Sequence, residues 1–383
     1  MTRPAPPQWF RRLPLQSLLA VAALALVAGL WGVGVYRPVP SPPAVLSADA
    51  PRVSEERCSE CHSDITDTFP MTPHANTLHR VTEEGIAERF DGRSFVHTGT
   101  GTRFDYRLEN DRLIVSTPAY ARELAIEWIF GSGTHAQTPL ITWTDEDGTT
   151  QSIEHCVSWY PTGELAETLG TEELAESSGI HALGHHRGTP QTTNCFGCHS
   201  RYVPVEDGGI RFDHLQAGIG CARCHWDVEQ HVEEMDRGDD ATIERFASLP
   251  PREAVDRCGE CHRRAQDMGG AIEPDDTSIA RFAPVGLVQS PCFQQQGQVR
   301  LASGEPGRLD CTTCHDPHRP ANHAWQTYVV SCHACHDGER DRARTCTSPR
   351  TAENCLECHM PKVPANDHLV FTDHWIRVRS TEE

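Results

Sequence analysis

The strongest hydrophobic pattern in the chain is an unbroken apolar run of eighteen residues at 18–35. At about 1.5 Å per residue it nearly spans a hydrocarbon layer about 30 Å thick, so it predicts a transmembrane helix. Arg3, Arg11 and Arg12 precede the run, which places the N-terminus in the cytoplasm and the remainder outside. A cleaved signal peptide is the alternative for residues 1–37. The prolines that follow predict a semi-rigid linker over 38–52.

Alternation of apolar and polar residues predicts two hairpins, over 102–117 and 139–156. The first turns at Glu109, Asn110 and Asp111, and the second at Asp147 and Gly148. Helical spacing predicts helices over 119–130 and 163–178, and another over 54–62 behind Ser54 as N-cap. We therefore expect residues 53–190 to hold a small mixed α/β insert, which serves as a docking surface, a lid or a plain structural element.

Seven copies of the pattern CxxCH interrupt these elements, and they are numbered here as motifs one to seven. They lie at 58–62, 195–199, 221–225, 258–262, 311–315, 332–336 and 355–359. CxxCH is the attachment signature of c-type haem. Two cysteines three residues apart lie on one side of a helical turn, where they bond two positions on the porphyrin edge, and the histidine ligates the iron. Zinc is the alternative for a single CxxC, but a histidine after all seven pairs favours haem.

The expected cofactor is therefore haem c, with seven groups bound covalently. The predicted attachment residues are Cys58, Cys61, Cys195, Cys198, Cys221, Cys224, Cys258, Cys261, Cys311, Cys314, Cys332, Cys335, Cys355 and Cys358. The predicted proximal ligands are His62, His199, His225, His262, His315, His336 and His359.

Each site has about 47 residues of chain from residue 53 onward, so porphyrin would form much of the core. The expected fold class is mainly α with extensive loops, with the small β-containing insert and the N-terminal transmembrane helix. Residues 191–383 are expected to form one region with six haem groups. Cys156, Cys292 and Cys346 lie outside the motifs. Two of them could form a disulfide, or one could bind a haem iron as a thiolate ligand.

The sixth coordination position of each iron decides what the site can do. An iron with two histidine ligands has no free coordination position and only transfers electrons, whereas an iron with one histidine ligand can bind a substrate. Fifteen histidines lie outside the motifs, which is enough to close every site. The best-placed candidates are His74, His135, His231, His318 and His374. His231 follows His225 by six residues, a rotation of about 240° on a helix, so it should meet a neighbouring site.

Several motifs together resemble the multihaem cytochromes of the cytochrome c-552/c-554 family. They are CSECH with MTPHA, CARCHWDVEQHV, SPCFQQ ahead of CTTCHDPH, and CLECHMP followed by FTDHWI. The resemblance implies closely stacked haems, ligation by two histidines at most of them, and electron transfer. It supports His74, His231, His318 and His374 as distal ligands. CHDPH also resembles pentahaem nitrite reductases, but Lys362 is the one lysine here and follows no CxxC, so their lysine-ligated haem has no counterpart.

The net charge of -20 excludes nucleic acid as a partner and favours basic proteins or cations. The leading hypothesis is an exported electron carrier, anchored in the cytoplasmic membrane by a single pass, with its haem region in the periplasm or another extracytoplasmic space. Its partners would be redox proteins that donate and accept electrons. The alternatives are a reductase acting on a small nitrogen or sulfur compound at one open haem, and a subunit of a haem filament.

Overall fold

The structure is a computed structural model that describes residues 53–171, 174, 178–241, 243–301, 303–336 and 354–379. The predicted anchor over 1–37, the linker over 38–52 and Cys346 lie outside these residues. None of the helices within the described ranges combines the length and apolar character needed to cross a membrane.

Both predicted hairpins are confirmed. The first consists of β3 (Arg103–Glu109) and β4 (Arg112–Thr117), and the second of β7 (Thr138–Thr144) and β8 (Thr150–His155). Asn110 and Asp111 at the first turn have φ of 52° and 59°. These are the left-handed values that a two-residue turn needs to match the twist of its strands. Asn and Asp tolerate this region better than other side chains do.

The predicted helices over 119–130 and 163–178 are wrong. Residues 119–130 form β5 (Tyr120–Ile126) and β6 (Trp128–Phe130), and the second range contains β10 (Leu165–Glu167). Ala, Leu, Glu and Arg favour a helix locally, but β5 pairs with β4 and places Leu113 opposite Ile126. Pairing and burial outweighed a helix propensity of a few tenths of a kcal/mol per residue, at most about 0.7.

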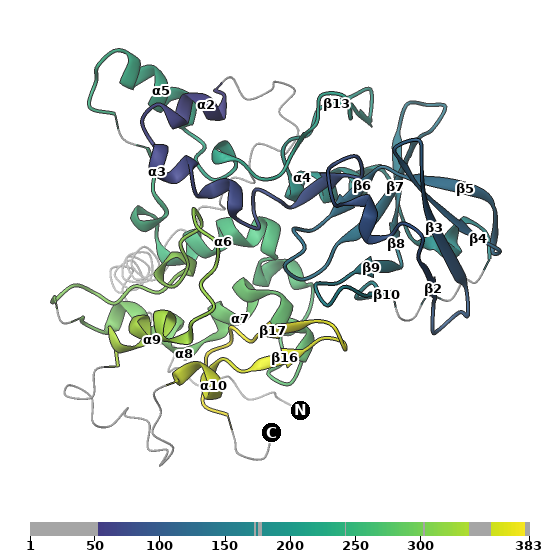
Figure 1. The fold of residues 1–383 in the computed structure, drawn as a ribbon. Coiled ribbons are helices and arrows are strands. Elements are labelled where there is room, and N and C mark those ends of the chain that lie inside the picture. Colours follow the sequence, from purple (N-terminus) through teal and green to yellow (C-terminus); the bar gives the residue numbers. More distant parts are fainter. Residues whose placement is uncertain are drawn as a thin grey trace, which may run out of the picture. The chain divides into compact units, whose positions relative to one another are not determined.

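The interval between the first two motifs is therefore a β-structure rather than a mixed insert (Figure 1). One sheet has the order β2-β3-β4-β5, with β2 at Ser94–Val96. The other has the order β1-β6-β7-β8-β11, with β1 at Leu78–Arg80 and β11 at Gly184–Arg187. β9 (Val157–Trp159) pairs with β10. Their shared core includes Phe90, Phe104, Leu113, Ile129 and Ile153.

The expectation of a mainly α fold is wrong for the described residues, whose strands form six sheets. The smaller strands are β12 (Ser200–Tyr202), β13 (Val205–Glu206), β14 (Gly209–Ile210), β15 (Gln216–Ala217), β16 (Lys362–Pro364) and β17 (Val370–Thr372). The helices are α2 (Glu55–Ser59), α3 (Ser63–Thr66), α4 (Thr189–His199), α5 (Val228–Asp236), α6 (Pro251–His262), α7 (Ala283–Gln289), α8 (Pro291–Gln295), α9 (Trp325–His333) and α10 (Cys355–His359). A CxxCH motif requires only one helical turn, so seven motifs do not imply a helical fold.

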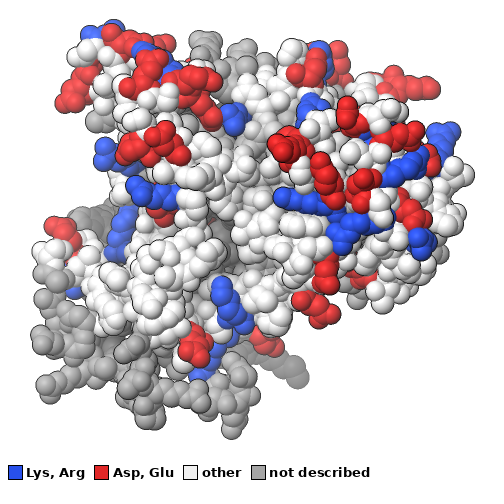
Figure 2. Space-filling view, in the orientation of Figure 1, with Lys and Arg blue, Asp and Glu red and all other residues white. Residues whose placement is uncertain are grey.

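The predicted helix at the first motif is present as α2, which starts directly after Ser54, although the Ser54 side chain makes no capping hydrogen bond. Arg57 of α2 forms an ion pair with Asp236 of α5, so these two helices are neighbours. Acidic side chains gather over α2 and α5 (Figure 2), including the exposed Glu56 and Glu233.

Replacing Leu113 with alanine is expected to destabilise the β-structure by about 2–5 kcal/mol, because the side chain is 0 % exposed and would leave a cavity. Leu108 lies directly opposite on β3 and is 38 % exposed, so Leu108→Ala is the matched control with a cost below about 1 kcal/mol. Urea unfolding followed by tryptophan fluorescence measures both. Equal losses of stability in the two variants would contradict the described core.

Candidate functional site

Each CxxCH motif occupies a helical turn or its end. Motifs two and four end α4 and α6, while motifs three and five begin in the 3-10 helices Cys221–Arg223 and Cys311–Thr313. The backbone N–H of the motif histidine donates to the carbonyl of the first cysteine at 2.9 Å in motifs one, five and six, and at 3.0 Å in motif three. This turn brings the two thiols and the imidazole of a motif together, as attachment and ligation require.

Four motif histidines face a histidine from outside the motifs. The ring centres are 6.4 Å apart for His62 and His231, and 5.9 Å for His262 and His74. They are 6.2 Å apart for His225 and His318, and 6.3 Å for His315 and His374. His231 thus faces the first motif rather than its own, and His318 faces the third motif rather than the fifth.

These separations fit an iron between the two rings. An imidazole nitrogen lies about 2 Å from a bound transition metal and about 1 Å from its ring centre, so two axial imidazoles have centres about 6 Å apart. Direct ring stacking would bring the centres closer, and an ordinary surface histidine would need no partner. The four pairs therefore have the spacing that ligation by two histidines requires.

Backbone carbonyls fix the orientation of several imidazoles. The Nδ1 atoms of His199, His359 and His374 each lie 2.9 Å from a carbonyl oxygen, of Thr77, Arg377 and Thr372 respectively. A carbonyl only accepts, so Nδ1 of each ring donates and, in the neutral imidazole, Nε2 keeps its lone pair for a metal. A backbone acceptor at this position is typical of histidines that ligate metals.

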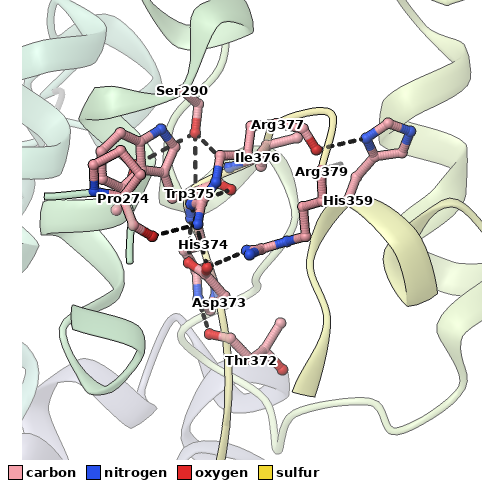
Figure 3. A network of polar contacts seen from close by, with 11 residues as sticks. Pro274, Ser290, His359, Thr372, Asp373, His374, Trp375, Ile376, Arg377 and Arg379 are labelled. Atoms are coloured by element: carbon pink, nitrogen blue, oxygen red, sulfur yellow. Dashed lines mark hydrogen bonds and ion pairs between the residues drawn. The ribbon is translucent and has the colours of Figure 1, made fainter. Parts of the chain in front are cut away.

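The C-terminal segment 372–379 holds two of these imidazoles at once (Figure 3). It carries His374 itself and supplies the Arg377 carbonyl to His359 of motif seven. The hydroxyl of Ser290 donates to the His374 carbonyl at 3.2 Å and accepts from the N–H of Ile376 at 2.8 Å. The segment therefore ties motif seven and the partner of His315 to α7 and α8.

Burial keeps the central imidazoles neutral. It lowers the pKa of His262 to about 4, and the nearby imidazoles of His74, His199, His374 and His315 add to this shift. Burial also lowers the pKa of His374 to about 4. Neutral imidazole is the form that binds iron, so these rings are available as ligands at neutral pH.

Thiols from different motifs lie close enough to interact. The interacting pairs are Cys58 with Cys221, Cys198 with Cys261, Cys258 with Cys311, and Cys332 with Cys355. Cys224 lies near Cys258 and Cys261, and Cys332 lies near Cys314, close enough for their charges to interact. Together these interactions link all seven motifs. Motif four, at 258–262, has motifs two, three and five as neighbours.

Other candidate residues are placed differently. His135 packs its ring 5.4 Å from that of Phe371 on β17 rather than against a motif histidine. Among the described residues, which include all 22 histidines, no pair like the four above contains His199, His336 or His359. His199 instead has Phe130 at 4.8 Å between ring centres. The distal partners of motifs two, six and seven therefore stay open.

The two described cysteines outside the motifs differ in their surroundings. Cys156 is 0 % exposed in the core of the β-structure, and burial raises the pKa of its thiol to about 12. The thiol is therefore protonated at neutral pH in this buried position. Cys292 is partly buried and lies near the thiols of Cys314 and Cys335.

Arg223 is a residue of the site that the motif pattern did not predict. It occupies the last position before the second cysteine of motif three, and its Nη2 donates to the carbonyl of Gly197 in motif two at 3.0 Å. The feature of the sequence that could have indicated it is a charged residue between the two cysteines of a CxxCH motif. Its contact with another motif depends on the fold.

Comparison with known proteins supports the same chemistry. The family described as cytochrome c554 and c-prime matches residues 158–226, a stretch that contains motifs two and three. The crystal structure of the outer cell wall cytochrome OcwA is similar in fold, with a TM-score of 0.51 and 15 % sequence identity. The similarity covers 85 % of this chain and 79 % of that one. No curated protein sequence matches the chain.

The predicted resemblance to multihaem cytochromes is thus confirmed by a family match and by a shared fold. The motif turns and the paired imidazoles agree with covalently bound haem c, whose iron supplies one-electron transfer. The seven motifs, the family match over residues 158–226 and the similar fold together support a multihaem c-type cytochrome, whose haems would transfer electrons.

Proposed function

We propose that the protein is a carrier with seven haem c groups, one at each CxxCH motif, that conducts electrons between redox partners. The observation that carries this proposal is the contact between motifs. Each motif has its sulfur atoms beside those of at least one other. Because attachment occurs through these sulfurs, neighbouring haem edges would lie close together. Electron transfer through a protein requires such short separations.

Four of the seven irons would be closed by histidine on both faces. The proposed pairs are His62 with His231, His262 with His74, His225 with His318, and His315 with His374. A closed iron binds no substrate and only exchanges electrons. The side chains of the chain act here as ligands and spacers, and none is needed as an acid or base. His135 remains a candidate ligand for one of the other three sites.

The cellular position is proposed from the sequence. The apolar segment 18–35 with arginines before it would hold the protein at the cytoplasmic membrane, with the haem region on the extracytoplasmic side. Covalent haem attachment through cysteine thioethers suits an exported protein.

The acidic surface over α2 and α5 suits a redox partner with a basic surface (Figure 2). A cavity of about 600 Å³ near motif three is lined by four carboxylates, of Asp227, Glu229, Glu233 and Glu244, with Trp226 and Gln230. A basic partner docked here would lie near motifs one and three. Its association should weaken as salt is raised from low to physiological strength.

The haem content of the purified protein tests the proposal. The pyridine haemochrome assay, divided by protein concentration from amino-acid analysis, should give seven haems per chain. Replacing both Cys355 and Cys358 with alanine should lower that number to six. A wild-type value below seven, or zinc in place of iron, would refute the proposed haem number.

Reduction of a small nitrogen or sulfur compound at motif two is a second candidate function. His199 is oriented for ligation by the Thr77 carbonyl, and the ring nearest to it is Phe130 instead of a histidine. Such a site would leave one face of an iron open. Carbon monoxide bound to the reduced wild-type protein, together with turnover of nitrite or hydroxylamine, would favour this function. Turnover is not expected from a carrier that only exchanges electrons, even where carbon monoxide binds.

A further inference from the structure

Arg223 lies where three haem motifs meet. Its guanidinium belongs to motif three, donates to the Gly197 carbonyl of motif two at 3.0 Å, and interacts with the thiol of Cys261 in motif four. It also acts electrostatically on Cys198 and Cys224. One side chain therefore interacts with both motifs that adjoin its own.

The charge of Arg223 is not neutralised by a close carboxylate. The ion pairs of the described chain include Arg201 with Glu55, Arg257 with Glu244, and Arg264 with Asp267, but none that contains Arg223. Its Nε is buried and has no hydrogen-bond partner among the described residues. Glu260 of motif four is near enough to interact with it electrostatically but makes no ion-pair contact. A guanidinium keeps its proton at any physiological pH, so the positive charge is permanent.

A fixed positive charge favours the reduced state of a nearby iron centre. Ferric haem carries one more positive charge than ferrous haem, so a neighbouring cation destabilises the ferric form more. Partial burial reduces solvent screening and strengthens this effect. Charge near the site is one of the means by which a protein sets a haem potential.

We propose that Arg223 raises the reduction potentials of the haem sites at motifs two, three and four, so that electrons reside preferentially at this junction. The proposal rests on the proposed presence of haem at these three motifs. The junction also connects with motif five through Cys258 and Cys311, so its potential governs exchange across the whole set. Arg223 would thus be a tuning residue, which acts on the irons through charge without ligating them.

Spectroelectrochemical titration of Arg223→Gln and Arg223→Lys tests this role. Glutamine keeps a hydrogen-bond donor for the Gly197 carbonyl and removes the positive charge. Lysine keeps the positive charge and lacks the planar set of N–H donors of the guanidinium. In Arg223→Gln we expect the reduced-to-oxidised ratio at the junction sites to fall by about three- to tenfold at a given potential. The upper value corresponds to about 59 mV for a one-electron couple. Arg223→Lys should remain close to wild type.

Arg107→Gln is the control for loss of one positive charge from the chain. Arg107 is exposed on β3 and paired with Glu123, away from the motifs in sequence, so its loss should leave the titration unchanged. Unchanged potentials in Arg223→Gln, or equal shifts in the glutamine and lysine variants, would overturn the proposal. Loss of a haem from Arg223→Gln would identify an anchoring role and would also overturn it.

The haem assay separates this inference from the proposed function. If the wild-type protein lacks haem at motifs two, three or four, the proposed function fails first, whatever the variants show. If seven haems are present and the potentials do not respond to the charge of Arg223, only the inference fails.

Discussion

Replacing His74 with alanine should convert one low-spin haem into a high-spin haem that binds one additional carbon monoxide per chain. His74 lies between motif one and β1, and its ring centre is 5.9 Å from that of His262 in motif four. Alanine would remove the proposed sixth ligand, while Cys258, Cys261 and His262 would still hold the cofactor. The haem number should therefore stay at seven. Electron paramagnetic resonance of the oxidised protein and carbon monoxide difference spectra of the reduced protein measure the change.

Two further variants define the cause of that change. His214→Ala removes an exposed histidine that contacts Asp213, and it should leave both spectra unchanged. His74→Met offers another sixth ligand, so it should restore a low-spin iron with a raised potential. If His74→Ala stays fully low-spin and binds no additional carbon monoxide, His74 is not the distal ligand of motif four.

Replacing Gly286 with alanine should destabilise the protein and displace His374, although alanine normally stabilises a helix. Gly286 lies within α7, where glycine to alanine usually contributes about 0.5–1 kcal/mol of stability. Here a Cβ would lie 2.8 Å from the backbone nitrogen of Trp375 and 3.1 Å from the carbonyl carbon of His374. Overpacking of this kind costs about 1–3 kcal/mol, so the contact should reverse the sign of the substitution.

The displaced segment carries the partner of His315, so the second readout is spectroscopic. Part of the haem at motif five should become high-spin, and denaturant unfolding should shift to lower concentration. Gly297→Ala is the control, because a Cβ there meets no atom within 4 Å. A stabilised Gly286→Ala protein with an unchanged spin state would show that segment 372–379 does not pack on α7 as described.

Local turn chemistry explains why the two hairpins were predictable. Asn110, Asp111 and Gly148 adopt left-handed backbone values, and these residue types are the ones that favour them. The strand β5 was not predictable in the same way, because its Ala, Arg, Glu and Leu residues fit a helix equally well. Pairing with β4 made this segment a strand, and such pairing produces the β-rich fold.

The sequence alone determined the chemistry of the attachment sites, because each CxxCH lies within five consecutive residues and one helical turn supplies its geometry. It also provided all four histidines that pair with motif histidines, because histidine is the residue type that serves as such a ligand. Only the tertiary structure decided which imidazole meets which motif. His74 joins His262 across 188 residues, and His231 meets His62 rather than its neighbour His225. The partner that each imidazole meets depends on chain folding over long separations, as does the junction around Arg223. Local helical spacing excluded only His225 as the partner of His231.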